Sequence, residues 1–180
     1  MTNEERLRLY LIRLGEVEGA ADGKLLGRTD APLSKRGLEQ SRALAQVLSE
    51  AQLSAVYSSD LQRARRTAEI IAQRRNLKVQ ESSAWREIDM GQWEGRTIGA
   101  LHNESPALVA QLFNDPVAFQ YPGGESFSDF IGRVQAAVSQ LLQTHCSGDI
   151  ALVAQVAKGV ALAEPLHPNN RIVPHLRMSL

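Results

Sequence analysis

The chain is poor in cysteine, has no long apolar run and carries no excess of either charge. Its single cysteine, Cys146, excludes an internal disulfide and leaves no set of metal-ligating cysteines. Twenty basic residues balance twenty acidic ones, so no net field favours nucleic acid or an anionic membrane surface. We therefore expect neither nucleic acid nor a membrane as a partner, and no metal or other cofactor.

The longest apolar stretch, Ile150 to Ala163, is interrupted by Gln155 and Lys158 and is too short to span a bilayer. The first eight residues are polar and charged, without the apolar core of a secretory signal. These features predict a cytoplasmic protein. With 180 residues, of which 43% are hydrophobic, we expect one domain over residues 1–180, and the sequence predicts no oligomeric state.

Apolar runs of strand length alternate with amphipathic segments of helix length. We expect strands at 7–13, 55–57, 77–80 and 150–154, and helices at 34–48, 61–75, 98–113 and 126–144. Ser34 and a residue of the segment 58–60 are candidate N-caps. This alternation predicts an α/β fold, a three-layer α/β/α sandwich with a mostly parallel central sheet.

Three short segments lie at the carboxyl ends of three of the expected strands. These are Arg13-Leu14, Ser58-Ser59 and Ala154-Gln155. Ligand sites of parallel sheets form at the carboxyl ends of the strands. We therefore expect these three segments to surround one site.

Four blocks in this order resemble the histidine phosphatase superfamily, the phosphoglycerate mutase-like proteins. They read LYLIRLGEVEG from Leu9, SSDLQRARRTA from Ser58, REIDMGQWEG from Arg86 and YPGGES from Tyr121. The chain most resembles the shorter phosphatases of that family, including alpha-ribazole phosphatase. From about residue 155 it departs from the family pattern, and this part is expected to be atypical or shortened.

The resemblance implies a role for five positions. Arg13 and Arg63 match phosphate-binding arginines, and Glu87 matches the acid that protonates the leaving oxygen. Leu14 stands where the family has its nucleophilic histidine, and Gln155 stands where it has a second histidine. The implied ligand is phosphate or a small phosphomonoester.

The two replacements remove the chemistry that the family uses. An imidazole has a lone pair and a pKa near neutrality, so it can attack phosphorus and later leave, whereas a leucine side chain has neither lone pair nor proton. Gln155 can donate a neutral hydrogen bond but offers no charge to a transferring phosphoryl group. The two arginines could still clamp an oxyanion.

Simpler interpretations exist for the same residues. Taken alone, Arg63 lies in a run of arginines that is typical of a solvated helix face, and Glu87 is typical of a loop carboxylate. Leu14 continues an apolar strand, and we expect it to pack. The chain's four histidines stand in other sequence contexts, where surface positions are expected: His102, His145, His167 and His175.

Three hypotheses follow for the function. In the first, which we favour, the chain is a catalytically inactive member of the family that keeps a phosphate-binding pocket. In the second, it is a weak phosphomonoesterase that uses water attack assisted by Glu87 rather than a phosphohistidine. In the third, it is a decayed or engineered inactive copy.

Overall fold

Five parallel strands form the centre of the molecule. The computed structural model describes residues 7–155 and the backbone of residues 171–176, while residues 1–6, 156–170 and 177–180 lie outside this description. The strand order is β3-β2-β4-β1-β5, and every pairing is parallel. The strands are β1 (Leu7–Ile12), β2 (Leu53–Ser58), β3 (Val79–Glu81), β4 (Gly148–Val153) and β5 (Arg171–Leu176).

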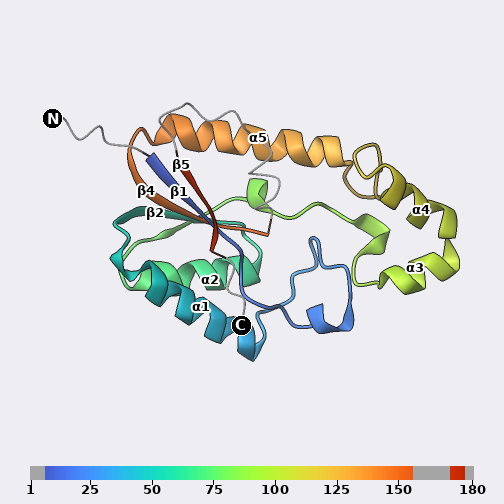
Figure 1. Ribbon diagram of the computed structural model, residues 1–180, viewed down its shortest axis with the longest axis horizontal. Coiled ribbons are helices and arrows are strands. Elements are labelled where there is room, and N and C mark those ends of the chain that lie inside the picture. The colour runs from blue at the N-terminus through green and yellow to red at the C-terminus, as the bar shows by residue number, and fades with distance from the viewer. Residues whose placement is uncertain (1–6, 156–170, 177–180) are drawn as a thin grey trace.

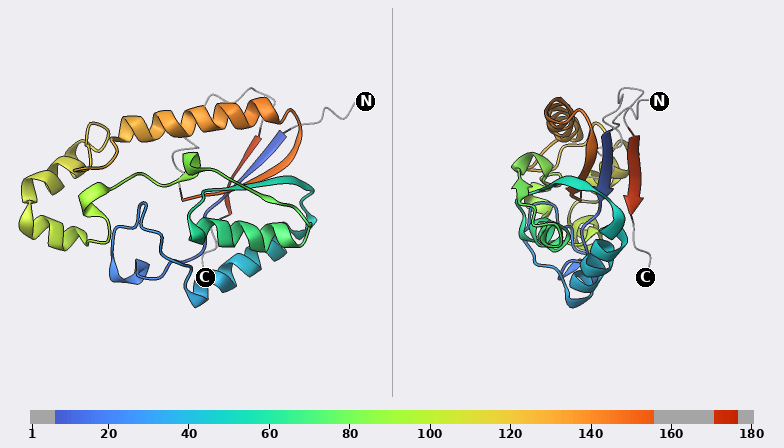
Figure 2. Two further views of the ribbon diagram at one scale, coloured as in Figure 1. Left: turned by 180° about the vertical axis from the view of Figure 1, so that it is seen from behind. Right: turned by 90° about the vertical axis from the view of Figure 1, so that its left-hand side faces the viewer.

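Helices cover both faces of this sheet, as Figure 1 and the edge-on view in Figure 2 show. Helices α1 (Lys35–Val47) and α2 (Gln62–Gln73) lie on one face, and α5 (Phe127–Thr144) lies on the other. Two short helices, α3 (Ile98–Glu104) and α4 (Pro106–Asn114), lie beyond the sheet at one end of the molecule. The predicted three-layer α/β/α sandwich is confirmed.

The core consists of two main apolar clusters separated by the sheet. Along β4 the side chains alternate between them: Ile150 and Leu152 pack towards α5, and Ala151 and Val153 pack towards α1 and α2. Successive side chains of a strand point to opposite faces, so a fully covered strand is apolar throughout. This is why the sequence from residue 150 reads as a continuous apolar run.

One helix start agrees with the sequence, and another differs. Ser34 accepts a hydrogen bond from the backbone N–H of Gly37 at 3.0 Å and caps α1, as predicted. The prediction of a cap from residues 58–60 for α2 is wrong. The carboxylate of Asp30, far away in sequence, accepts from the backbone N–H of Gln62 at 2.8 Å instead.

The prediction of one continuous helix over residues 98–113 is wrong. The helix is interrupted at Ser105, and a second helix begins with Pro106 at its first position. Proline fits there because its fixed φ suits a helix start and its missing N–H would have no partner in that turn.

Strand β5 was not predicted from the sequence. In the described part of the chain, no helix is long and apolar enough to cross a membrane.

A close backbone contact fixes the loop after β1 against the start of α1. A Cβ on Gly37 would lie 2.0 Å from the carbonyl oxygen of Glu16, and a Cβ on Gly15 would lie 2.3 Å from the carbonyl oxygen of Gly37. Only glycine allows this approach at both positions. The Glu16 carboxylate also accepts from the Ser34 hydroxyl at 2.7 Å. The first candidate segment of the site, residues 13–14, is thereby held on α1.

A pair of Gly→Ala variants tests this contact. Gly37→Ala forces the loop away from α1 and is expected to destabilise the protein by about 1–3 kcal/mol, the usual range for overpacking. Gly132, exposed in α5, has open space around its Cβ position. Gly132→Ala is therefore expected to stabilise by about 0.5–1 kcal/mol. Urea unfolding of both variants measures the difference, and equal effects would contradict the close contact.

Candidate functional site

The sheet brings the three predicted segments to one edge. Val153 at the end of β4 is level with Ile12 of β1 and with Ser58 of β2. Beyond that level the backbone N–H of Ala154 still donates to the carbonyl of Ile12 at 3.0 Å. The residues that follow these three strands therefore emerge side by side, as expected, and their role in one site stays a prediction.

Leu14 is buried, with 9% of its surface exposed. It belongs to the apolar cluster between the sheet and helices α1 and α2, together with Ile12, Val17 and Leu33. A buried leucine contributes about 1.5–3 kcal/mol through removal of its surface from water. Leu14 thus packs as the sequence interpretation expected, and it offers no atom that could attack a phosphoryl group.

Arg63 is almost completely buried, with 1% of its surface exposed, in the first turn of α2. Its terminal nitrogens donate to main-chain carbonyls of one loop, those of Leu26 (3.2 Å), Gly27 (2.5 Å) and Thr29. Its Nε atom is buried without a hydrogen-bond partner. Burial lowers the pKa of this guanidinium, and the charges of Asp30, Glu87 and Glu94 oppose that shift. Arg63 is therefore not the surface residue that its arginine-rich run alone would suggest.

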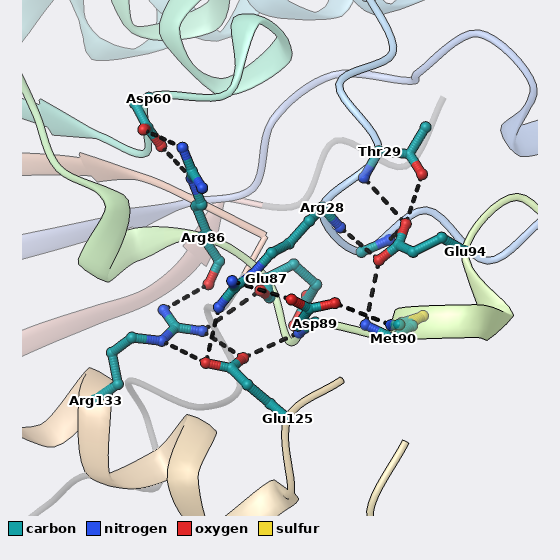
Figure 3. A network of polar contacts seen from close by, with 12 residues as sticks. Arg28, Thr29, Asp60, Arg86, Glu87, Asp89, Met90, Glu94, Glu125 and Arg133 are labelled. Carbon is teal, nitrogen blue, oxygen red and sulfur yellow. Dashed lines mark hydrogen bonds and ion pairs between the residues drawn. The ribbon is translucent and has the colours of Figure 1, made fainter. Parts of the chain in front are cut away.

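Glu87 lies among positive charges near the middle of the polar network in Figure 3. Burial raises the pKa of its carboxyl. A hydrogen bond from the backbone N–H of Ile88, at 2.8 Å, and the charges of Arg63, Arg133 and Arg13 oppose this rise without cancelling it. A raised pKa keeps the proton on a carboxyl to higher pH, which suits a proton donor.

Arg13 and Gln155 complete the predicted set. Arg13 is exposed directly after β1, and its charge reaches Glu87. Gln155 is partly buried after β4, and its Oε1 atom is buried without a hydrogen-bond partner. The charge interactions connect Arg13, Arg63 and Glu87, while the strand register places Gln155 beside the same segments.

The role of Glu94 was not predicted from the sequence. Its carboxylate accepts from the backbone N–H groups of Gly27 (3.1 Å), Arg28 (2.7 Å) and Thr29 (3.0 Å) and from the Thr29 hydroxyl at 2.6 Å (Figure 3). Burial alone would raise its pKa, but these hydrogen bonds and one from Met90 outweigh burial and lower it. Glu94 therefore holds the amides of the loop whose carbonyls Arg63 holds.

A second missed feature is a network of two arginines and two carboxylates (Figure 3). Arg28 contacts Asp89 at 3.1 Å and Glu125 at 2.8 Å. Glu125 also accepts from Arg133 at 2.9 and 3.0 Å. Burial opposes ionisation of Glu125, yet the Arg133 hydrogen bonds, the Asp89 N–H and the two positive charges lower its pKa.

This network supports the segment that carries Glu87. Arg133 of α5 also donates to the main-chain carbonyls of Ala84 (2.8 Å), Arg86 (3.0 Å) and Glu87 (3.4 Å). Arg86 in turn binds Asp60 through two bonds of 2.7 and 2.6 Å, which connect this segment to the end of β2. The sequence blocks contained Asp60, Arg86, Asp89 and Glu125, whereas Arg28 and Arg133 stand in none of them.

The described histidines lie away from this set, as their sequence context suggested. His102 lies in α3 and lines a hollow of about 490 Å³ between α3 and α4. His145 ends α5, and its Nε2 lies 2.8 Å from the Tyr57 hydroxyl. Among residues 7–155, no group of three or more histidine, cysteine, aspartate or glutamate side chains is placed to hold a metal ion. The chemical resources of the site are thus two arginines, one carboxyl and one amide.

The loop contacts of Glu94 predict a pH-dependent stability. Because its folded pKa lies below its ordinary value of 4.5, ionised Glu94 stabilises the fold above that pH, and the contribution is lost as the pH falls through the folded pKa. Glu94→Gln is expected to cost about 1–3 kcal/mol at pH 7. The cost is expected to shrink towards pH 4, as urea unfolding at both pH values would show.

The control for this prediction is Glu39→Gln, at an exposed carboxyl on α1. It is expected to change the unfolding free energy by less than about 0.5 kcal/mol at either pH. A Glu94→Gln cost that stays the same from pH 7 to pH 4 would contradict the role of the ionised carboxylate.

Solved structures with a similar fold include a phosphatase. An alpha-ribazole phosphatase from Shigella flexneri is 31% identical, with a TM-score of 0.77 over 81% of this chain and 72% of its own. The Bacillus stearothermophilus protein YhfR is 29% identical, with a TM-score of 0.81 over 86% of this chain and 78% of its own.

Sequence comparison agrees. The Salmonella choleraesuis protein named "Probable phosphoglycerate mutase GpmB" is 36% identical over 137 residues, 76% of this chain. The chain spans 64% of the length of that curated relative. The model of the histidine phosphatase superfamily (branch 1) matches residues 9–163. The chain belongs to the histidine phosphatase superfamily.

Proposed function

We propose that this protein binds phosphate or a small phosphomonoester and does not turn it over through a phosphohistidine. The observation that carries the proposal is the Nε atom of Arg63, a buried donor without a partner at the edge of the sheet where the site segments meet. Buried polar atoms rarely lack a partner in native proteins, so such an atom indicates a missing ligand or water. An arginine in this setting favours an oxyanion.

The absence of turnover follows from Leu14 and Gln155. Leu14 is part of the core and has no lone pair, so no covalent phosphoryl intermediate can form there. Gln155 carries no charge with which to stabilise a phosphoryl group in transfer. Binding requires neither step, because Arg13 and Arg63 supply positive charge without a nucleophile.

Glu87 is the specific observation behind a second candidate, a weak phosphomonoesterase. Its raised pKa suits protonation of a leaving oxygen, which is half of a hydrolytic reaction. The other half, activation of water, needs a deprotonated base, and a raised pKa works against that role. We therefore rank binding above hydrolysis.

The relatives favour a small phosphorylated ligand. The names alpha-ribazole phosphatase and phosphoglycerate mutase both describe enzymes of small phosphate compounds. Because the chain spans 64% of the length of its curated relative, an activity of the whole relative is not transferred to it. A cytoplasmic location stays a prediction from the sequence.

Calorimetric titration with inorganic phosphate tests the binding proposal. We expect measurable affinity in the millimolar range or tighter, and a loss of roughly 10–100-fold in Arg13→Gln, since a hydrogen bond to a charged group contributes about 1.5–3 kcal/mol. Arg65→Gln is the matched control, because Arg65 is exposed on α2 and contacts Glu69 and Glu81 at 3.8 and 3.9 Å. No binding at millimolar phosphate would refute the proposal.

A double reversion tests the assignment of the two replaced positions. Leu14→His with Gln155→His is expected to gain hydrolysis of p-nitrophenyl phosphate by roughly 10³-fold or more over the unmodified chain, since removal of a nucleophile in another hydrolase costs about 10⁶-fold. Adding Glu87→Gln to the double variant should remove most of the gain. A folded double variant without activity would show that the remaining residues do not form a competent site. Hydrolysis by the unmodified chain that Glu87→Gln abolishes would favour the second candidate.

A further inference from the structure

Apolar side chains gather on the outside of helices α3 and α4, at the end of the molecule beyond the sheet (Figure 1). The exposed residues within 98–118 are called the α3–α4 surface below. In the described part of the chain, the large apolar side chains that are exposed are Val47, Leu108, Phe113 and Val117. All but Val47 belong to this surface, and Phe113 and Val117 are 68% and 61% exposed. Single exposed apolar residues are ordinary, whereas several on one short segment indicate an interaction surface.

Charge is almost absent from the α4 half of this surface. Between Glu104 and Gln120 the only charged residue is Asp115. Its carboxylate accepts a hydrogen bond from the backbone N–H of Ala118 at 3.0 Å, so it serves the turn after α4. Solvated helices carry charges on their outer face, while the centres of protein interfaces are depleted of charge and enriched in aromatic residues. Helix α4 therefore has the composition of an interface.

The shape of the α3–α4 surface combines a hollow with an exposed aromatic ring. The hollow of about 490 Å³ between the two helices is lined by Ile98, Gly99 and Ala110 among others. Phe113 borders it and is largely exposed to solvent. No atom lies within 4 Å of the position of a Cβ on Gly99. A surface that has both a hollow and a ring of this kind can be complementary to itself.

We propose that the α3–α4 surface pairs with the same surface of a second copy of this chain, and that Phe113 of each copy enters the hollow of the other. In such a two-fold interface the same contact is made twice. A second copy fits the charge of this surface, because a partner with charged contacts would have to desolvate them against uncharged side chains. The formal net charge of zero at pH 7 also leaves no net repulsion between two copies.

The size of the surface sets the strength of the dimer. A standard interface takes about 20–30 residues from each partner, and the exposed residues within 98–118 are fewer. We therefore expect a weak dimer with a dissociation constant of about 1–100 µM. The pairing is independent of the proposed phosphate-binding function, because none of the residues proposed to bind phosphate belongs to this surface.

Sedimentation equilibrium of the full chain from about 5 to about 500 µM tests the proposal, since this range spans the expected dissociation constant. Phe113→Ser is expected to weaken the dimer by at least about 30-fold, because an aromatic anchor is lost twice in each dimer. Val47→Ser is the matched control. It removes an apolar side chain that is 58% exposed on α1, outside the α3–α4 surface, and is expected to change the dissociation constant by less than about twofold.

Gly99→Leu separates a fitted interface from general apolar adhesion. A leucine at this position fills the hollow and adds apolar surface at the same time. If Phe113 of the partner enters the hollow, Gly99→Leu is expected to weaken the dimer by at least about tenfold. If the surface only adheres to apolar groups, the same substitution strengthens association. Gly99 and Phe113 are both exposed, and urea unfolding checks that each variant folds.

Each outcome decides the proposal. A concentration-dependent dimer that Phe113→Ser and Gly99→Leu weaken and Val47→Ser leaves unchanged supports it. A chain that stays monomeric up to about 500 µM overturns the second copy as occupant and leaves the surface to another protein or an apolar small molecule. A dimer that keeps its strength in Phe113→Ser, or gains strength in Gly99→Leu, overturns the proposed contact.

Discussion

The loop of residues 26–29 depends on two charged side chains that hold its backbone, the buried Arg63 and the partly buried Glu94. Arg63 donates to its carbonyl oxygens, and Glu94 accepts from its amide N–H groups. Buried backbone polar groups are costly when unpaired, so these charged side chains replace the partners that regular secondary structure would provide. The loop carries Arg28 into the ion-pair network that supports Glu87, and Asp30 directly after it caps α2. The geometry of the site thus follows from how this loop is held.

The position of Leu14 is fixed by a different part of the structure. The contact between Gly15 and Gly37 places the segment after β1, and Leu14 fills the apolar cluster beneath it. Nothing in this packing depends on a histidine. Replacing a polar functional group by an apolar one that packs well is commonly neutral or favourable for stability. The fold can therefore be kept without the catalytic group, and the presence of the fold says little about turnover.

The sequence predicted those features that depend on local patterns. Apolar strands, the cap at Ser34 and the convergence of three strand ends all follow from residue spacing, and the structure agrees. It could not predict features that depend on distant partners. Asp30 caps α2 from 32 residues away, and Glu94 binds a loop more than 60 residues before it. The break at Ser105 was readable from Pro106 but was missed because the apolar spacing continues through it.

Arg63 has a structural use at the site, which changes what its presence implies. Arg63 would be needed for the loop of residues 26–29 even in a protein that binds nothing. Its presence in the chain is therefore weak evidence for a ligand, and the evidence lies instead in the one N–H group that the loop does not use. Arg13 differs, because it is exposed and no hydrogen bond within residues 7–155 holds its guanidinium. Since folding makes no visible use of Arg13, it is the residue whose loss would separate ligand binding from stability.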